Sequence, residues 1–290
     1  MEKSVRGGEA AIIFLCSIGA FFIKLPLSSD DGTDLAALLF AFLLSILSVF
    51  VIYRPLIHLL NVGKGRLQRA VLPIKILVIG GFLIFTVDTL AQLSAYTEKV
   101  VLQGRSRGLI FIFLAALFVT VAKVGQKALS KTAVALALIA AAALATVFVF
   151  FLPSANFKYL GMTEVAKLGE AFFDGVFIYF KTAFEGLVTA AAAAGSATKI
   201  KNAMLGTALA SLAISAAFFI TLLVFGGGFA ETLRYPFTSA VGIVGRGEVF
   251  SGMDGFLYLI IFVTSVFKGA AALFGAAKVA RGLKFAKNFK

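Results

Sequence analysis

Charged side chains stand inside otherwise apolar stretches of this chain, and two of them are spaced so that they can act together. Lys181 and Glu185 lie four residues apart, so on a continuous helix they share a face and can neutralise one another. Charges at membrane depth are costly and face a protein interior or a water-filled cavity. The pair therefore has two interpretations: a structural ion pair, or groups that bind a substrate or a proton.

Asp88 is a second candidate for an ion-linked role. It stands in the middle of an apolar stretch between two threonines, with Gln92 one helical turn later and no basic residue within a turn. A buried carboxylate without a cation beside it is poised to bind a proton near neutral pH. In the alternative interpretation, a lysine from another stretch, Lys75 or Lys181, pairs with Asp88.

Other kinds of chemistry have little support in these residues. Cys16 is the single cysteine and His58 the single histidine, which argues against a disulfide, a multi-histidine metal site and histidine-based catalysis. The sequence contains no paired nucleophile and base, no cluster of metal ligands and no phosphate-binding loop. We therefore expect no enzymatic activity, no metal and no cofactor.

The elements that must position these charges are membrane-spanning helices. The chain has 290 residues, of which 60% are hydrophobic and 14% charged, and its mean hydropathy is +1.01. A water-soluble domain could not bury so much apolar surface. The composition and pattern predict an all-α, polytopic membrane protein with about eight transmembrane helices. The expected spans are 9–27, 35–60, 70–97, 108–124, 132–152, 171–195, 203–226 and 254–277.

The basic residues predict the orientation of these spans. With the N-terminus inside, sixteen lysines and arginines fall in cytoplasmic segments and seven in outer loops, so both termini are expected in the cytoplasm. The net charge of +13 is therefore not a sign of nucleic-acid binding. Residues 278–290 form a basic cytoplasmic tail, for which the anionic headgroups of membrane lipids are the expected partner.

The first and sixth spans carry matching irregularities. Gly19, Lys24 and Pro26 interrupt the first span, and the sixth contains Lys181, Glu185 and a glycine within its apolar run. Interrupted spans in corresponding places of two halves indicate a transporter binding site. If the first five spans form one repeat at 1–153, the sixth begins a partial, inverted second repeat at 154–277, within a single transmembrane domain. Gly80 and Gly81 predict close helix packing in the third span.

Several segments resemble the spore germination permeases, the GerAB-type membrane subunits of germinant receptors in the amino acid, polyamine and organocation transporter superfamily. The segment 9–26 is similar to the first helix of that family, and 180–186 resembles the aromatic, glycine and acid pattern of the sixth helix. The C-terminal residues that carry the resemblance are Tyr235, Pro236, Gly247, Glu248, Met253, Asp254, Gly255, Phe256, Phe262, Thr264, Phe267 and Lys268.

The resemblance implies a broken-helix fold with inverted repeats and a pocket for a small molecule between the first and sixth helices, with Asp88 on the third helix nearby. The residues that it places at this pocket are Ser17, Ile18, Gly19, Ala20, Phe180, Phe184, Glu185 and Gly186. It implies an amino acid-like germinant as the ligand, other receptor subunits as partners, and the cell or spore inner membrane of a spore-forming bacterium as the location.

Two functions follow from these expectations. The first is a permease-like subunit of a spore germinant receptor that binds or passes a small amino acid-like solute. The family has ten spans where about eight are expected here, and the small-residue helices suit close packing. The alternative is therefore a non-transporting membrane component that assembles a larger complex.

Overall fold

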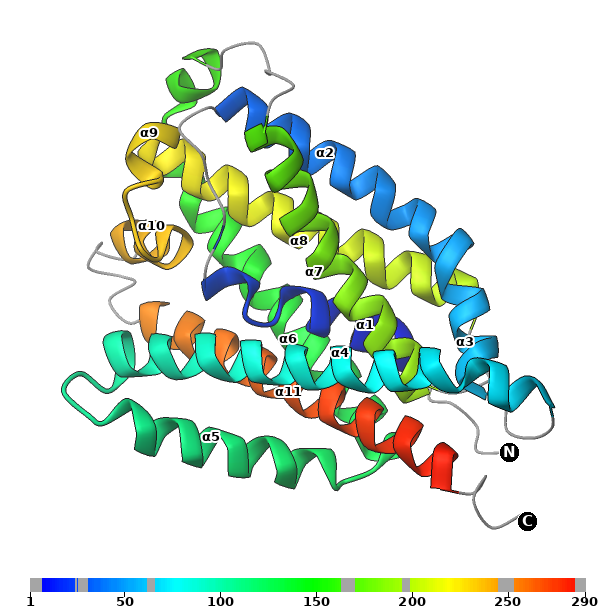
Figure 1. Ribbon diagram of the computed structural model, residues 1–290. Coiled ribbons are helices and arrows are strands. Elements are labelled where there is room, and N and C mark those ends of the chain that lie inside the picture. The colour runs from blue at the N-terminus through cyan, green and yellow to red at the C-terminus, as the bar shows by residue number, and fades with distance from the viewer. Residues whose placement is uncertain are drawn as a thin grey trace.

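Helices account for all the regular structure in the described part of the chain. The computed structural model describes residues 7–23, 25, 31–61, 66–162, 170–194, 199–244 and 253–284, and these ranges contain no strand. The elements, in chain order, are α1 (Gly8–Ile18), η1 (Phe21–Ile23), α2 (Asp31–Ser48), η2 (Val49–Tyr53), α3 (Arg54–Asn61), α4 (Arg66–Tyr96), η3 (Thr97–Val101), α5 (Arg107–Ala122), α6 (Gln126–Phe151), η4 (Leu152–Ser154), η5 (Phe157–Met162), α7 (Glu170–Ala194), α8 (Ile200–Phe225), α9 (Gly227–Ala230), α10 (Pro236–Val244) and α11 (Met253–Lys284) (Figure 1). The short elements η2 and η3 are π-helical, and η1, η4 and η5 are 3₁₀ helices.

The long helices have the length and composition that crossing a membrane requires. Among the described residues, six stretches qualify: Leu35–Leu60, Val71–Val101, Gln126–Phe151, Phe172–Ala193, Ile200–Phe225 and Gly255–Leu283. Two shorter apolar stretches, Gly8–Ile23 and Arg107–Ala122, coincide with the first and fourth predicted spans. The chain is an all-α, polytopic membrane protein, as its composition predicts.

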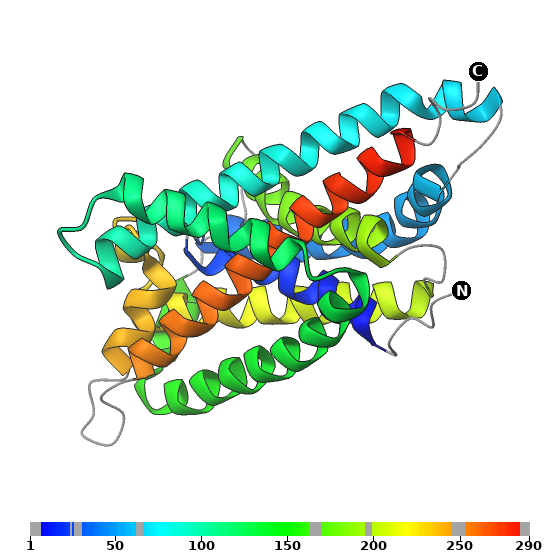
Figure 2. The same ribbon diagram turned by 90° about the horizontal axis from the view of Figure 1, so that it is seen from below.

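α1 begins and α11 ends at the same end of the bundle (Figures 1 and 2). This end is called the near end below, and the opposite one the far end. An even number of crossings gives this arrangement. Which end faces the cytoplasm stays a prediction, as does the division into repeats at 1–153 and 154–277.

α1 is the central helix of the bundle. All 11 of its residues are buried, and it packs against α6, α7, α8 and α11. A helix that is apolar on every face belongs in such a place. A protein-buried α1 also holds the interrupted part of the first span in the interior.

The helix of α1 stops after Ile18, and the chain continues as the short turn η1. Gly19 has an extended backbone with φ −60° and ψ 128°, and Ala20 adopts a left-handed conformation with φ 65°. A β-carbon on Gly19 would lie 2.6 Å from the carbonyl oxygen of Thr264 in α11, so only glycine fits there. The predicted interruption of the first span is confirmed.

The backbone at this break is held by the surrounding helices. The N–H of Ala20 donates a hydrogen bond to Oγ of Ser265 in α11 at 2.9 Å. The ring of Phe21 lies 5.9 Å from that of Tyr179, and the ring of Phe22 lies 5.0 Å from that of Phe237. The break is therefore a packed feature of the interior. Lys24 and Pro26, which the sequence also placed at it, lie outside the described residues.

The predicted interruption of the sixth span is wrong, because α7 runs unbroken from Glu170 to Ala194. Its two central charges are both paired, so they do not require free backbone groups, and its alanine-rich C-terminal third favours a helix. Gly186 serves close packing instead. A β-carbon there would lie 2.8 Å from the carbonyl oxygen of Ile13, so α1 and α7 approach as closely as they do only because this residue is glycine.

The predicted close packing at Gly80 and Gly81 is also wrong, since a β-carbon on either would meet no atom within 4 Å. The close approach occurs at Gly206 of α8, where a β-carbon would lie 2.6 Å from the carbonyl oxygen of Ala10. Glycine spacing alone does not reveal which face of a helix meets a neighbour.

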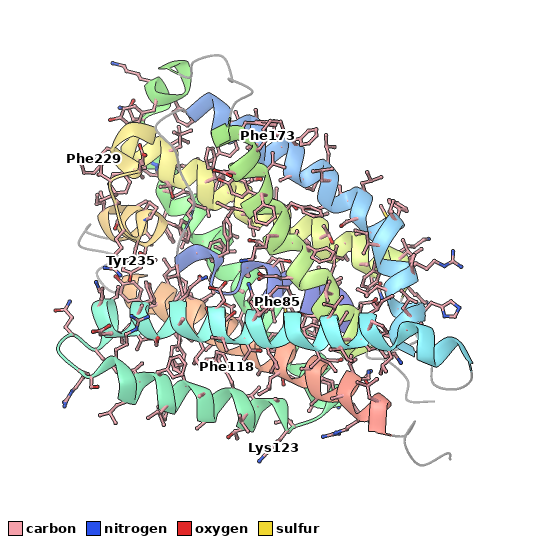
Figure 3. All side chains as sticks on the ribbon, viewed as in Figure 1. Phe85, Phe118, Lys123, Phe173, Phe229 and Tyr235 are labelled. Atoms are coloured by element: carbon pink, nitrogen blue, oxygen red, sulfur yellow. The ribbon has the colours of Figure 1, made fainter. Side chains whose placement is uncertain are left out.

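The remaining long helices pack in pairs around α1. α4 lies along α11, and α2 lies along α7. α5 lies on the outside of the bundle against α11 and α4, where the ring of Phe118 covers Gly269 of α11 (Figure 3). α11 is therefore the element on which α4, α5, α7 and α1 all rest.

Two segments differ from their expected structure. The stretch between the seventh and eighth predicted spans contains the helix α10, which packs against α8 and η1, while Gly247 and Glu248 lie outside the described residues. α11 continues through the predicted basic tail as far as Lys284. Lys278 in this part donates hydrogen bonds to Oε1 of Gln126 at 3.0 Å and to the carbonyl oxygen of Ala193 at 3.1 Å. The partnership of the tail with anionic lipids stays a prediction.

Candidate functional site

Four charged side chains form a continuous series across the bundle. Oδ2 of Asp88 lies 3.7 Å from Nζ of Lys181, and the same Nζ lies 3.8 Å from Oε1 of Glu185. Oε2 of Glu185 lies 2.5 Å from Nζ of Lys268. The signs alternate along the series, so its members carry no net charge together. We refer to these residues as the charge series.

Three helices position the charge series near mid-depth. Lys181 and Glu185 stand one turn apart on one face of α7, and Lys268 stands close to the middle of the 32 residues of α11. Asp88 reaches the series from α4, which lies along α11 as α7 does. α11 thus brings together side chains from α4 and α7.

The two ends of the series lie in different surroundings. Glu185 and Lys268 are only 4% and 7% exposed, and they are joined by a short charge-assisted hydrogen bond. The side chains of Lys181 and Asp88 are 46% and 43% exposed. We call the first two the buried pair and the other two the half-exposed pair. The series therefore runs from an open position into the protein interior.

The structure decides between the interpretations of Asp88 that the sequence left open. Lys181 is the lysine that approaches it, and Nε2 of Gln92 donates a hydrogen bond to its other carboxylate oxygen at 3.0 Å. Asp88 is therefore not a carboxylate without a cation. The predicted proximity of Lys181 and Glu185 is confirmed, but the closer partner of Glu185 is Lys268.

Lys268 is the member of this site that the sequence did not assign to it. Its distance from Glu185 along the chain exceeds 80 residues, so no local spacing connects the two. The available signal was its place in the middle of the eighth span, because a lysine there requires a carboxylate partner. The β-carbon of Lys268 also lies against the break in α1, 3.0 Å from where a β-carbon of Gly19 would be.

The residues of α1 that the family resemblance places at a pocket are packed against protein. Ser17, Ile18 and Ala20 are at most 3% exposed, and Gly19 and Gly186 are buried as well. Oγ of Ser17 lies against Gly186 and has no hydrogen-bond partner among the described residues. The structure therefore brings these α1 residues together with Glu185 and Gly186, but it leaves no exposed backbone among them.

Phe180 and Phe184 of α7 are neighbours of Lys181 along the helix. Their rings are stacked, with centroids 5.9 Å apart and an interplanar angle of 28°, and both side chains are half-buried. Phe184 and Phe85 of α4 pack against the same small apolar cluster between α4, α7 and α11 (Figure 3). α7 thus carries a pair of stacked rings within one turn of Lys181.

A second buried carboxylate, which the sequence analysis did not single out, lies at the near end. Glu9 in the first turn of α1 is 3% exposed, and it accepts hydrogen bonds from the hydroxyl of Tyr53 in η2 and from the backbone N–H of Lys199 at 3.2 Å. Lys199 precedes α8, so the carboxylate caps the positive end of that helix. The signal in the sequence was a glutamate at the start of an apolar span.

The charge series can bind charged groups or pass a proton, because it combines two carboxylates, which accept hydrogen bonds, with two ammonium groups, which donate them, in a low-dielectric setting.

Comparisons of the chain with protein-family models, with curated protein sequences and with solved structures find no match.

Proposed function

We propose that the chain is a membrane permease-like subunit that binds or passes a small amino acid-like solute, as its resemblance to the spore germination permeases implies. The observation that supports this function is the charge series beside the break in α1. Charged side chains at membrane depth are energetically costly. They are found there where they bind solutes, move protons or pair with one another. The location in a spore-forming bacterium and the other receptor subunits belong to the same proposal.

A role in assembling a larger complex is the second candidate. It is supported by the half-exposed pair itself, because a helix of a partner subunit that covered Asp88 and Lys181 would remove both charges from lipid. This candidate predicts that complexes form through the faces of α4 and α7, and that no free solute stabilises the isolated chain.

Thermal unfolding of the detergent-purified protein tests the first candidate. The protein is melted with each of a panel of amino acids, nucleosides and sugars, and a ligand that binds only the folded state raises the melting temperature further as its concentration exceeds its Kd. A shift with amino acids that Glu231→Gln on the exposed surface leaves unchanged supports the proposal. No shift with any amino acid would contradict it and favour the assembly role.

A further inference from the structure

We propose that the half-exposed pair, Asp88 and Lys181, is the contact point for the charged groups of the solute, and that it takes a zwitterion. Asp88 binds the ammonium group and Lys181 the carboxylate. This inference rests on the proposed function, and it moves the contact from the broken helix α1 to α4 and α7.

The position given by the family resemblance is closed. No residue from Ser17 to Ala20 is exposed, α7 has no break, and the N–H of Ala20 is already bonded to Ser265. A solute at this position would have to displace packed side chains. The exposed polar atoms near mid-depth of α4 and α7 belong instead to Asp88 and Lys181.

Lys181 is loosely held. Its ammonium group has three hydrogen-bond donors, and its two neighbouring carboxylates lie 3.7 and 3.8 Å away. Charge-assisted N–H···O bonds are about 2.7–2.9 Å long, so neither neighbour forms one. Glu185 already has a short bond to Lys268. Lys181 can therefore turn toward the carboxylate of a solute.

Asp88 presents one oriented carboxylate oxygen toward Lys181. Its Oδ1 accepts a hydrogen bond from Gln92, which fixes the orientation of the carboxylate, and its Oδ2 faces Lys181 at a distance too long for a direct bond. A solute ammonium group that inserts beside Oδ2 gains a partner while the solute carboxylate gains Lys181. A solute with only one of the two charges would add a net charge to the site, whereas a zwitterion pairs with both residues and leaves the site neutral.

The stacked rings of Phe180 and Phe184 complete the site. They lie next to Lys181 on α7 and offer an apolar surface to the side chain of the solute. The geometry therefore favours zwitterions with apolar side chains over polar solutes of the same size.

The test compares three forms of one probe on the purified protein. L-leucine carries both charges, leucinamide only the positive one and N-acetyl-L-leucine only the negative one. Affinities from ligand-dependent melting are measured for wild type, Asp88→Asn, Lys181→Gln and Lys181→Arg. The exposed variant Lys123→Gln at the end of α5 is the control (Figure 3). Melting without ligand shows whether each variant is folded.

In the wild type we expect leucine to bind about tenfold or more tightly than either analogue. Asp88→Asn should weaken leucine about tenfold and leave N-acetyl-L-leucine unchanged, while Lys181→Gln should weaken leucine similarly and leave leucinamide unchanged. Lys181→Arg should retain binding. Leucine binding that neither variant changes, or analogues that bind as tightly as leucine, would overturn the zwitterion site and leave the proposed function standing. If no amino acid of the wider panel binds to the wild type, both are overturned.

Discussion

At the scale of single residues, the buried pair differs from the half-exposed pair in what it contributes to the fold. Glu185 and Lys268 are sequestered from solvent and joined at 2.5 Å, so within the described part of the chain each is the nearest oppositely charged partner of the other. Removing one member of such a pair leaves an uncompensated buried charge, whereas removing both leaves none. Lys181 has no short bond to lose.

Lys268→Met is therefore expected to destabilise the protein by about 3–5 kcal/mol, and Glu185→Gln in the same direction. The double variant should regain a large part of the loss. Lys181→Met is the matched control, because its half-exposed ammonium makes only long contacts, and its effect should stay within about 1 kcal/mol. Circular dichroism melting in detergent measures all four. Equal melting temperatures for Lys268→Met and Lys181→Met would contradict the role given to the buried pair.

Ala20 provides a second test at this scale, since it holds a left-handed conformation with φ 65° while 97% of its surface is covered. A β-branched residue is poorly compatible with this conformation, whereas glycine adopts it freely. We expect Ala20→Val to lower the melting temperature markedly and Ala20→Gly to be close to wild type. If the valine variant melts like wild type, α1 does not break at this residue.

At the scale of elements, helix packing depends on a few close approaches. Gly206→Ala would place a β-carbon 2.6 Å from the carbonyl oxygen of Ala10, and a backbone atom cannot move aside as a flexible side chain can. α1 and α8 must then separate, at a cost of about 1–3 kcal/mol. Gly81→Ala meets nothing within 4 Å and should be neutral or stabilise the helix by about 0.5–1 kcal/mol. Melting of the two alanine variants side by side measures the difference, and a reversed order would contradict the packing of α1 on α8.

The difference between Gly206 and Gly81 also illustrates which features the sequence could predict. The spans follow from apolar length, and the break in the first span follows from Gly19, because both are local properties of the chain. The unbroken α7 could not be predicted from the sequence. Gly186 is needed for the close approach of α1, and Glu185 is paired with Lys268 of α11, and neither contact can be seen in the local sequence. Lys268 joins Glu185 for the same reason: the pairing depends on which helices pack side by side.

At the scale of the whole molecule, the two ends of the bundle are fastened differently. At the near end, Glu9 ties α1 to η2 and to the start of α8, and Lys278 ties α11 to α6 and to the end of α7. At the far end, aromatic contacts prevail, with the ring of Tyr96 lying 5.2 Å from that of Tyr235 and 5.9 Å from that of Tyr258 (Figure 3). Opening the near end therefore requires the loss of charge-assisted hydrogen bonds.

Glu9→Gln tests this fastening through Cys16, the single cysteine of the chain, which is fully buried in α1 about 10 Å along the helix from Glu9. The amide is a weaker acceptor than the carboxylate, so the hydroxyl of Tyr53 and the N–H of Lys199 lose part of their bonds, and the first turns of α1 should open more often. We expect maleimide to label Cys16 about tenfold faster in this variant than in the wild type at a temperature where both remain folded. Glu231→Gln, on the exposed surface of the far end, should label at the wild-type rate. Equal rates for Glu9→Gln and wild type would mean that Glu9 does not hold α1 closed, and the near end would then have to be kept shut by Lys278 and the apolar packing of α4, α7 and α11.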